Sequence, residues 1–229
     1  IADRHGLKVV YDAAHAFMCE INGRGIGNFG DISMFSFHPT KLFHTGEGGA
    51  LVYKDKNLKQ HIDLVKNFGI KNEDEIIMPG INGKMNEIQA ALGLIVLDLI
   101  ENERNKREEI LQKYLECLTS IDGILYYSPP ENITKSYQYF VIRIDEKVFG
   151  KSRDYVYHEF KKYNVFTRKY FYPLCSDYPC YKHLPSSRPE NLPNAQKAVK
   201  QVLSMPFYGG LCIDEVEKIG EILYRIKKS

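Results

Sequence analysis

The first part of the chain contains short apolar runs that polar, glycine-rich loops separate. Residues 7–11 form a continuous apolar run, as in a strand that a parallel sheet buries on both faces. Residues 32–37 and 49–53 predict two further strands. The link between these two is too short for a helical crossover, so we expect them to be antiparallel neighbours.

Helical spacing dominates the middle of the chain. Residues 56–68 place apolar side chains on one face, and residues 85–118 form the longest helical pattern of the chain. The first half of that long pattern is apolar almost all round, which predicts burial, and its second half is amphipathic and charged. A helix that passes from buried to exposed suits a connector between two domains. The pattern predicts later strands at 137–144 and 165–172, and helices at 152–163 (with Ser152 as N-cap), 194–204 and 214–227.

The order of these elements predicts two domains with a boundary near Asp98. Residues 1–97 alternate strand and helix, as in an α/β domain, and residues 98–229 read as a smaller α+β domain that the long helix enters. The chain begins at Ile1 without methionine, and its first residues read as the end of a helix with Gly6 as C-cap. We therefore expect the chain to be a fragment of a longer one.

Composition narrows the class of protein. The 229 residues are 44% apolar and 26% charged with a net charge of +2, as in a soluble globular protein. Scattered basic residues argue against nucleic-acid binding, and no apolar run is long enough to span a membrane. The five cysteines are irregularly spaced, which favours reduced thiols in a cytosolic, cytoplasmic protein. His15, His38 and His44 lack metal-ligand spacing, so we predict no metal site.

Candidate chemistry lies around Lys41. This lysine occupies a polar loop between two predicted strands, and Asp12 ends an apolar run 29 positions earlier. Alone, Lys41 would be interpreted as a solvated surface lysine and Asp12 as a turn or capping residue. Together they suit pyridoxal phosphate (PLP), since a lysine forms an imine with it and a carboxylate keeps its ring nitrogen protonated.

Three motifs give the chain a family resemblance. They are VVYDAAHA at 9–16, SMFSFHPTKLFHTGEGGALV at 33–52 and GINGKMNEIQAALGL at 80–94. In sequence, order and spacing they resemble the PLP-dependent nucleotide-sugar aminotransferases of the DegT/DnrJ/StrS family. The resemblance covers nearly the whole chain and is strongest up to residue 97. It implies the C-terminal portion of a type I aminotransferase: residues 1–97 as the remainder of the large PLP-binding domain, and 98–229 as the small domain.

The resemblance implies a role for each matching cofactor residue. Lys41 looks like the imine-forming lysine and Asp12 like the partner of the pyridine nitrogen. Ala14 would pack against the ring, and His15 stands where the family often has glutamine, near the ring hydroxyl. Ser36 looks like a ligand of the cofactor phosphate.

Further positions concern the substrate and a second subunit. Asn82 lies in a polar excursion at 69–83 and matches the position that reaches the cofactor phosphate of the neighbouring subunit, which implies a homodimer. Lys84 stands where arginine is usual and keeps a charge without the guanidinium fork. Tyr170 and Tyr172 resemble substrate-approaching aromatics, although packing explains them equally well.

The implied reaction is transamination of a nucleotide-linked keto-deoxysugar, with dTDP-4-keto-6-deoxyhexose and glutamate as the expected substrate and donor. Such a reaction belongs to deoxysugar and lipopolysaccharide (O-antigen) biosynthesis. Family members carry a further segment before these motifs, with a phosphate loop and a ring-stacking aromatic. A non-catalytic relative that binds a sugar nucleotide or a partner chain therefore stays open as the alternative. Dehydrating relatives have histidine in place of the imine lysine, so Lys41 argues against that chemistry.

Overall fold

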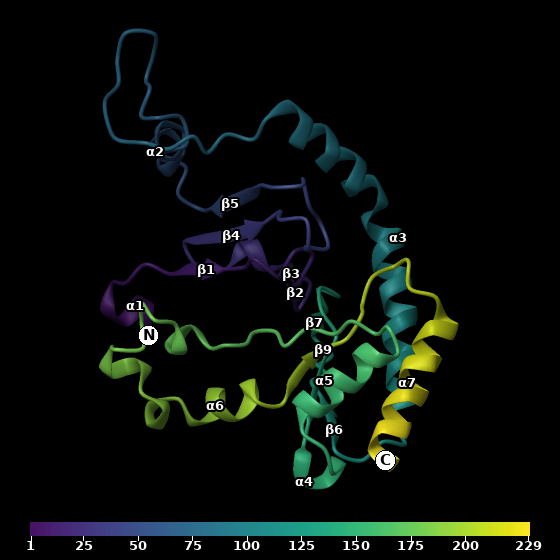
Figure 1. Ribbon diagram of the computed structural model, residues 1–229. Coiled ribbons are helices and arrows are strands. Elements are labelled where there is room, and N and C mark those ends of the chain that lie inside the picture. Colours follow the sequence, from purple (N-terminus) through teal and green to yellow (C-terminus); the bar gives the residue numbers. More distant parts are fainter. The chain divides into compact units, whose positions relative to one another are not determined.

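The computed structural model describes residues 1–229, which divide into two compact units (Figure 1). The first unit contains Ile1–Glu101 and Pro129–Gln138, and the second contains Asn102–Ser128 and Tyr139–Ser229. The sequence-based division at 97/98 differs chiefly in placing 129–138 in the second domain. Strand pairing of this segment attaches it to the first unit, and the division into domains stays a prediction.

A mixed three-stranded sheet organises the first unit. Helix α1 (Ala2–His5) ends at Gly6, which has φ 61°, and leads to β1 (Val10–Asp12). Strand β1 pairs in parallel with β4 (Ile32–Ser36), and β4 pairs antiparallel with β5 (Gly49–Tyr53), as predicted. The expected burial of the first strand was wrong. Because β1 is the edge strand of this sheet, its side chains are exposed, with Val10 at 65%.

A second small sheet joins distant segments of the first unit. Its order is β3 (Arg24–Gly25), β2 (Glu20–Ile21) and β7 (Ile133–Thr134), and both pairings are antiparallel. The 3-10 helix η1 (Ile26–Asn28) follows β3. Side chains reinforce the pairing, because the Asn132 amide donates to Asn22 Oδ1 at 3.0 Å.

Two helices complete the first unit. Helix α2 (Leu58–Val65) is followed by a loop that folds back through a bridge between Ile70 and Ile76 and extends away from α2 (Figure 1). Helix α3 (Glu87–Leu118) then continues into the second unit. The predicted burial of its first half was wrong, since Ile88 is 82% and Leu94 68% exposed. Only part of this helix packs in the first unit, where Ile100 contributes to a small core.

The second unit holds the larger core around an antiparallel sheet. Strand β8 (Val141–Ile144) lies between β6 (Ile124–Tyr126) and β9 (Val202–Ser204). The helices are α4 (Glu146–Phe149), α5 (Arg153–Lys162), α6 (Pro193–Val199) and α7 (Ile213–Lys228), with 3-10 turns η2 (Cys175–Asp177), η3 (Pro185–Ser187) and η4 (Pro189–Asn191). Fully buried Tyr114, Phe160 and Leu223 bring α3, α5 and α7 into one apolar cluster.

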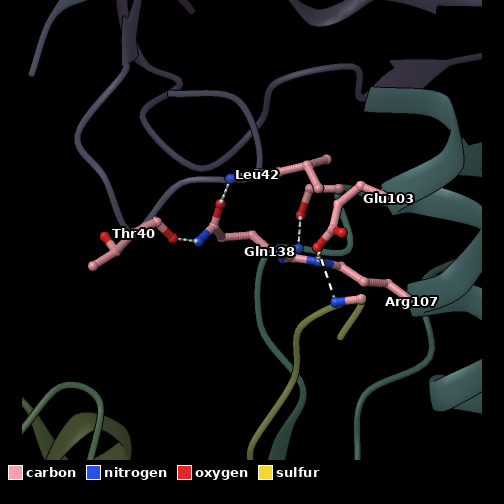
Figure 2. A network of polar contacts seen from close by, with 7 residues as sticks. Thr40, Leu42, Glu103, Arg107 and Gln138 are labelled. Carbon is pink, nitrogen blue, oxygen red and sulfur yellow. Dashed lines mark hydrogen bonds and ion pairs between the residues drawn. The ribbon is translucent and has the colours of Figure 1, made fainter. Parts of the chain in front are cut away.

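Polar contacts brace the start of the second unit. The Glu103 carboxylate accepts from Arg107 Nε at 2.7 Å and from the Gly209 N–H at 2.9 Å (Figure 2). Ser152 caps α5 as predicted, because its hydroxyl accepts the Tyr155 N–H at 3.2 Å. This cap satisfies one of the amide donors that every helix leaves unpaired at its start.

Three predicted elements of the second unit need correction. Residues 165–172 form no strand, and only Arg168 makes a bridge, to Ser204. The helix expected at 194–204 ends at Val199, and residues 202–204 become strand β9 because they pair with β8. The strand expected at 137–144 begins only at Val141. None of the helices combines the length and apolar character needed to cross a membrane.

Candidate functional site

Two residues that the sequence predicts for the site, Asp12 and Ser36, lie at the carboxyl ends of neighbouring strands in the first sheet. In the parallel pairing of β1 with β4, Asp12 stands opposite Met34, and the Ala13 N–H donates to the Met34 carbonyl at 2.8 Å. Ser36 ends β4 two residues further on, on the same face as Met34. The carboxyl ends of both strands therefore meet at one edge, where open α/β sheets place their ligands.

Electrostatic interactions tie Asp12, His15 and Lys41 together. Partial burial lowers the pKa of Lys41 below its usual value, and the negative charge of Asp12 works against this. Partial desolvation likewise lowers the pKa of His15, the positive charge of Lys41 lowers it further, and Asp12 opposes both. Three predicted cofactor residues thus form one coupled group. A lysine with a lowered pKa carries a larger neutral fraction, which is the form that acts as nucleophile or base.

The loop that carries Lys41 is closed by its own backbone. The Phe37 N–H donates to the Gly48 carbonyl at 2.9 Å, and the Thr45 N–H donates to the Phe37 carbonyl at 3.1 Å. Buried Thr45 also donates through its hydroxyl to the Glu47 carbonyl at 2.6 Å. The Lys41 N–H itself donates to the His38 carbonyl at 2.9 Å. The lysine therefore stands in a hydrogen-bonded loop.

An aromatic cluster anchors this loop to the unit. Phe43 is 7% exposed and stacks on Phe17 at a centroid distance of 4.6 Å. It meets Phe37 edge-on at 4.7 Å. These rings, with Leu42 and Ile100, form the core of the first unit. The sequence analysis did not identify this cluster as a support of the site, although Phe37 and Phe43 lie within four residues of Lys41 and could have drawn attention to it.

A hollow of about 1040 Å³ opens beside the same strands. Its lining includes Ala14, Ser36 and Lys84 from among the predicted residues, together with Met34–Phe35, Gly48–Leu51, Tyr53, Lys59, Ile62, Asp63, Lys66, Gly83 and Met85. The Ala14 N–H donates to Asp12 Oδ1 at 3.1 Å, which connects the hollow to the charged group. Lys84 donates to Asn67 Oδ1 and lies 4.8 Å from the centroid of the Phe68 ring.

The remaining predicted residues lie elsewhere. Asn82 is exposed and bridges to Asn67 through the backbone at the base of the 69–83 excursion. Tyr170 and Tyr172 belong to the second unit, where Tyr170 packs edge-on against Tyr139 at 5.4 Å. The Arg153 guanidinium lies 5.6 Å from the ring centroid of Tyr172. The roles of these three residues stay predictions.

A lysine amine that interacts with a carboxylate offers two of the groups that a PLP-dependent enzyme requires, and comparison with known proteins identifies the family. The chain belongs to the DegT/DnrJ/EryC1/StrS aminotransferase family, whose sequence model matches residues 1–224. Aminotransferases of this family are PLP-dependent.

Two curated relatives share the sequence over nearly its whole length. A dTDP-4-amino-4,6-dideoxy-D-glucose transaminase from Escherichia coli is 42% identical over 97% of this chain and 60% of its own length. A protein of the same name from Shigella dysenteriae is 37% identical over 99% of this chain and 61% of its own. The chain thus spans about three fifths of the length of these relatives.

The fold is also that of a solved structure, DesI in the presence of its TDP-sugar product. That structure superposes with a TM-score of 0.90 at 34% identity and covers 99% of this chain and 57% of the DesI chain. The predicted fold class, part of a type I PLP-dependent aminotransferase, is thereby confirmed.

The residues present fit the cofactor. Lys41 offers an amine with a lowered pKa, Asp12 a carboxylate that interacts with it, and Ser36 a hydroxyl on the wall of the hollow. Glycines at 48 and 49 belong to the same wall, and a Cβ at Gly48 would lie 2.4 Å from Thr45 Oγ1. An amine, a carboxylate and a hydroxyl are the groups that PLP requires. Of these, the Ser36 hydroxyl is on the wall of the hollow, whereas Lys41 and Asp12 are not among the residues that line it.

Proposed function

We propose that this chain supplies the lysine and the pyridine-nitrogen partner of a PLP-dependent nucleotide-sugar aminotransferase. The observation that carries the proposal is the coupled group of Asp12, His15 and Lys41 at the edge where β1 and β4 end. The names of two relatives, both dTDP-4-amino-4,6-dideoxy-D-glucose transaminases, support a dTDP-4-keto-6-deoxyhexose as the substrate. Glutamate as the amino donor rests on the family resemblance alone.

Each residue has a distinct task. When bound, PLP supplies an aldehyde and an electron-accepting ring, which together allow an amino group to pass from an amino acid to a keto sugar. Lys41 would hold the cofactor, and its amine, when free, would take and return the proton at the substrate carbon. Its lowered pKa favours the neutral amine that this proton transfer needs. Asp12 would keep a proton on the ring nitrogen, and His15 would hydrogen-bond near the ring hydroxyl.

Other residues hold the ends of the two ligands. The Ser36 hydroxyl would donate to the cofactor phosphate, and Ala14 would pack against the ring face; both residues line the hollow. Lys84, on the wall of the hollow, offers its ammonium group to an anionic part of the substrate. The protein works in the cytoplasm, in deoxysugar biosynthesis.

The lysine assignment has a direct test. The full-length protein is mixed with PLP, its absorbance spectrum is recorded, and the complex is reduced with borohydride and mapped by peptide analysis. We expect native protein to carry the label on Lys41 and the Lys41→Ala variant to carry none. The control variant Lys54→Ala, which removes an exposed lysine, should still be labelled on Lys41. Transfer of nitrogen from glutamate to the keto sugar is then measured. A label on another lysine, or full transamination by Lys41→Ala, would contradict the proposal.

A homodimer with shared sites is part of the proposal. Asn82, exposed in the 69–83 excursion, reaches the cofactor phosphate of the neighbouring subunit. Mixing subunits tests this, because a heterodimer of Lys41→Ala and Asn82→Ala subunits contains one site with both native residues. Activity that reappears on mixing two impaired variants supports shared sites. Activity that stays at the sum of the separate variants refutes them.

The second candidate function is that of a non-catalytic relative that binds a sugar nucleotide or a partner chain. A protein of this kind would bind a dTDP-sugar without forming a borohydride-reducible PLP complex. The spectrum and the peptide map therefore decide between the two functions.

A further inference from the structure

Gln138 is a buried polar residue that contacts the loop of Lys41 from a distant part of the sequence. It lies shortly before β8, in the segment that belongs to the first unit, and the residue is 5% exposed. The preceding residue, Tyr137, has φ 50°, a left-handed conformation that costs energy for any residue with a Cβ. Such strained backbone persists only where surrounding contacts hold it, and it occurs most often at functional sites.

The carboxamide of Gln138 binds the residues on both sides of Lys41. The Leu42 N–H donates to Gln138 Oε1 at 2.7 Å, and Gln138 Nε2 donates to the Thr40 carbonyl at 2.6 Å (Figure 2). One contact requires an acceptor and the other a donor, so the orientation of the amide is fixed by its partners. The contacts span 96 and 98 positions of sequence.

These two contacts determine how Lys41 is aimed. The Thr40 carbonyl belongs to the peptide group before the Lys41 Cα, and the Leu42 N–H belongs to the peptide group after it. When both peptide planes are held, φ and ψ of Lys41 are held as well, because these are the only soft backbone dihedrals of a residue. The direction of its Cα–Cβ bond is then fixed too.

We propose that Gln138 is a positioning residue for Lys41, an inference that rests on the function proposed above. It is not among the residues that line the hollow, and it acts through the backbone on either side of the lysine. The rest of the loop has its own supports in Thr45 and Phe43. Loss of Gln138 therefore leaves the loop folded but makes the orientation of the Lys41 side chain less well defined. Catalysis is sensitive to the orientation of a reacting group.

Two variants separate positioning from folding. Gln138→Met keeps length and apolar volume but loses both hydrogen bonds. Gln138→Glu accepts from Leu42 but, when ionised, offers no donor to Thr40; its protonated form does. Gln112→Met is the matched control. Gln112 is exposed on α3, and its side-chain amide donates to Glu108, four residues earlier on the same helix.

The first readout is independent of the cofactor. Amide hydrogen exchange of Leu42 in the cofactor-free protein should be at least ten-fold faster in Gln138→Met, with the amides of β4 and β5 unchanged. In the holoenzyme we expect kcat to fall about 10- to 100-fold with little change in KM for the amino donor. The Gln138→Glu variant should approach the native kcat as the pH falls and its carboxyl gains a proton.

The outcomes distinguish this inference from the proposed function. If native protein is not labelled at Lys41 by PLP and borohydride, the proposed function fails. If native protein is labelled, but Gln138→Met matches Gln112→Met in Leu42 exchange and in kcat, the positioning role is refuted. Slower catalysis accompanied by faster exchange throughout β4 and β5 would also overturn it, because Gln138 would then stabilise the unit as a whole.

Discussion

The strongest test of how the lysine loop is held is the replacement of Phe43. This side chain is 7% exposed, lies two residues from Lys41, and pairs with Phe17 and Phe37 at centroid distances of 4.6 and 4.7 Å. Phe43→Leu keeps most of the apolar burial and loses two aromatic pairs. At about 0.5–1.5 kcal/mol for each pair, the loop should lose about 1–3 kcal/mol. Phe43→Ala adds a cavity and should cost about 3–5 kcal/mol.

Native-state hydrogen exchange measures this loss locally, which suits a chain of two units. We expect amides of the loop and of β4 and β5 to lose protection in the order native, Leu, Ala, while α5 and α7 keep theirs. PLP affinity should fall in the same order. Phe166→Leu is the control, since that side chain is 66% exposed and should change stability by less than about 0.5 kcal/mol. Native protection of the loop in Phe43→Ala would refute the anchoring role.

Three further predictions concern charge and packing. In the cofactor-free protein, Lys41→Met should raise the pKa of His15, because it removes a neighbouring positive charge. Asp12→Asn should lower the pKa of His15, because it removes a neighbouring negative charge. NMR titration of the His15 imidazole measures both changes. Tyr114→Phe removes a buried hydroxyl that donates to a backbone carbonyl at 2.9 Å, and should cost the second unit about 1 kcal/mol in urea unfolding. Gly123→Ala should destabilise it by more than about 1 kcal/mol in the same assay, since φ is 85° and a Cβ would lie 2.4 Å from the backbone of α4. A neutral result for either variant would contradict the packing described.

Local patterns were sufficient for several elements. The antiparallel pair β4–β5, the long helix α3, helix α7 and the Ser152 cap can be predicted from apolar spacing, loop length and capping chemistry, and all are present. These signals act within a few residues of one another, so they are readable without knowledge of the fold.

Elements that depend on a distant partner were missed. Residues 202–204 have a helix-compatible sequence but form β9 because they pair with β8, about 60 positions earlier. Residues 165–172 look like a strand, yet only Arg168 finds a strand neighbour. Whether a segment forms a strand depends mostly on its neighbouring strands and on burial. A short stretch of sequence does not show either of these.

For the site, the sequence by itself determined the chemistry: one lysine, one aspartate and a set of motifs that together define an aminotransferase of this family. Only the tertiary structure decided how that chemistry is held. The register of β1 on β4 brings the strand ends together, and the fold carries Gln138 across about 96 positions to both sides of Lys41. A motif shows which reactive groups are present and their order along the chain. The direction in which the Lys41 amine points depends on contacts between segments that are far apart in the sequence.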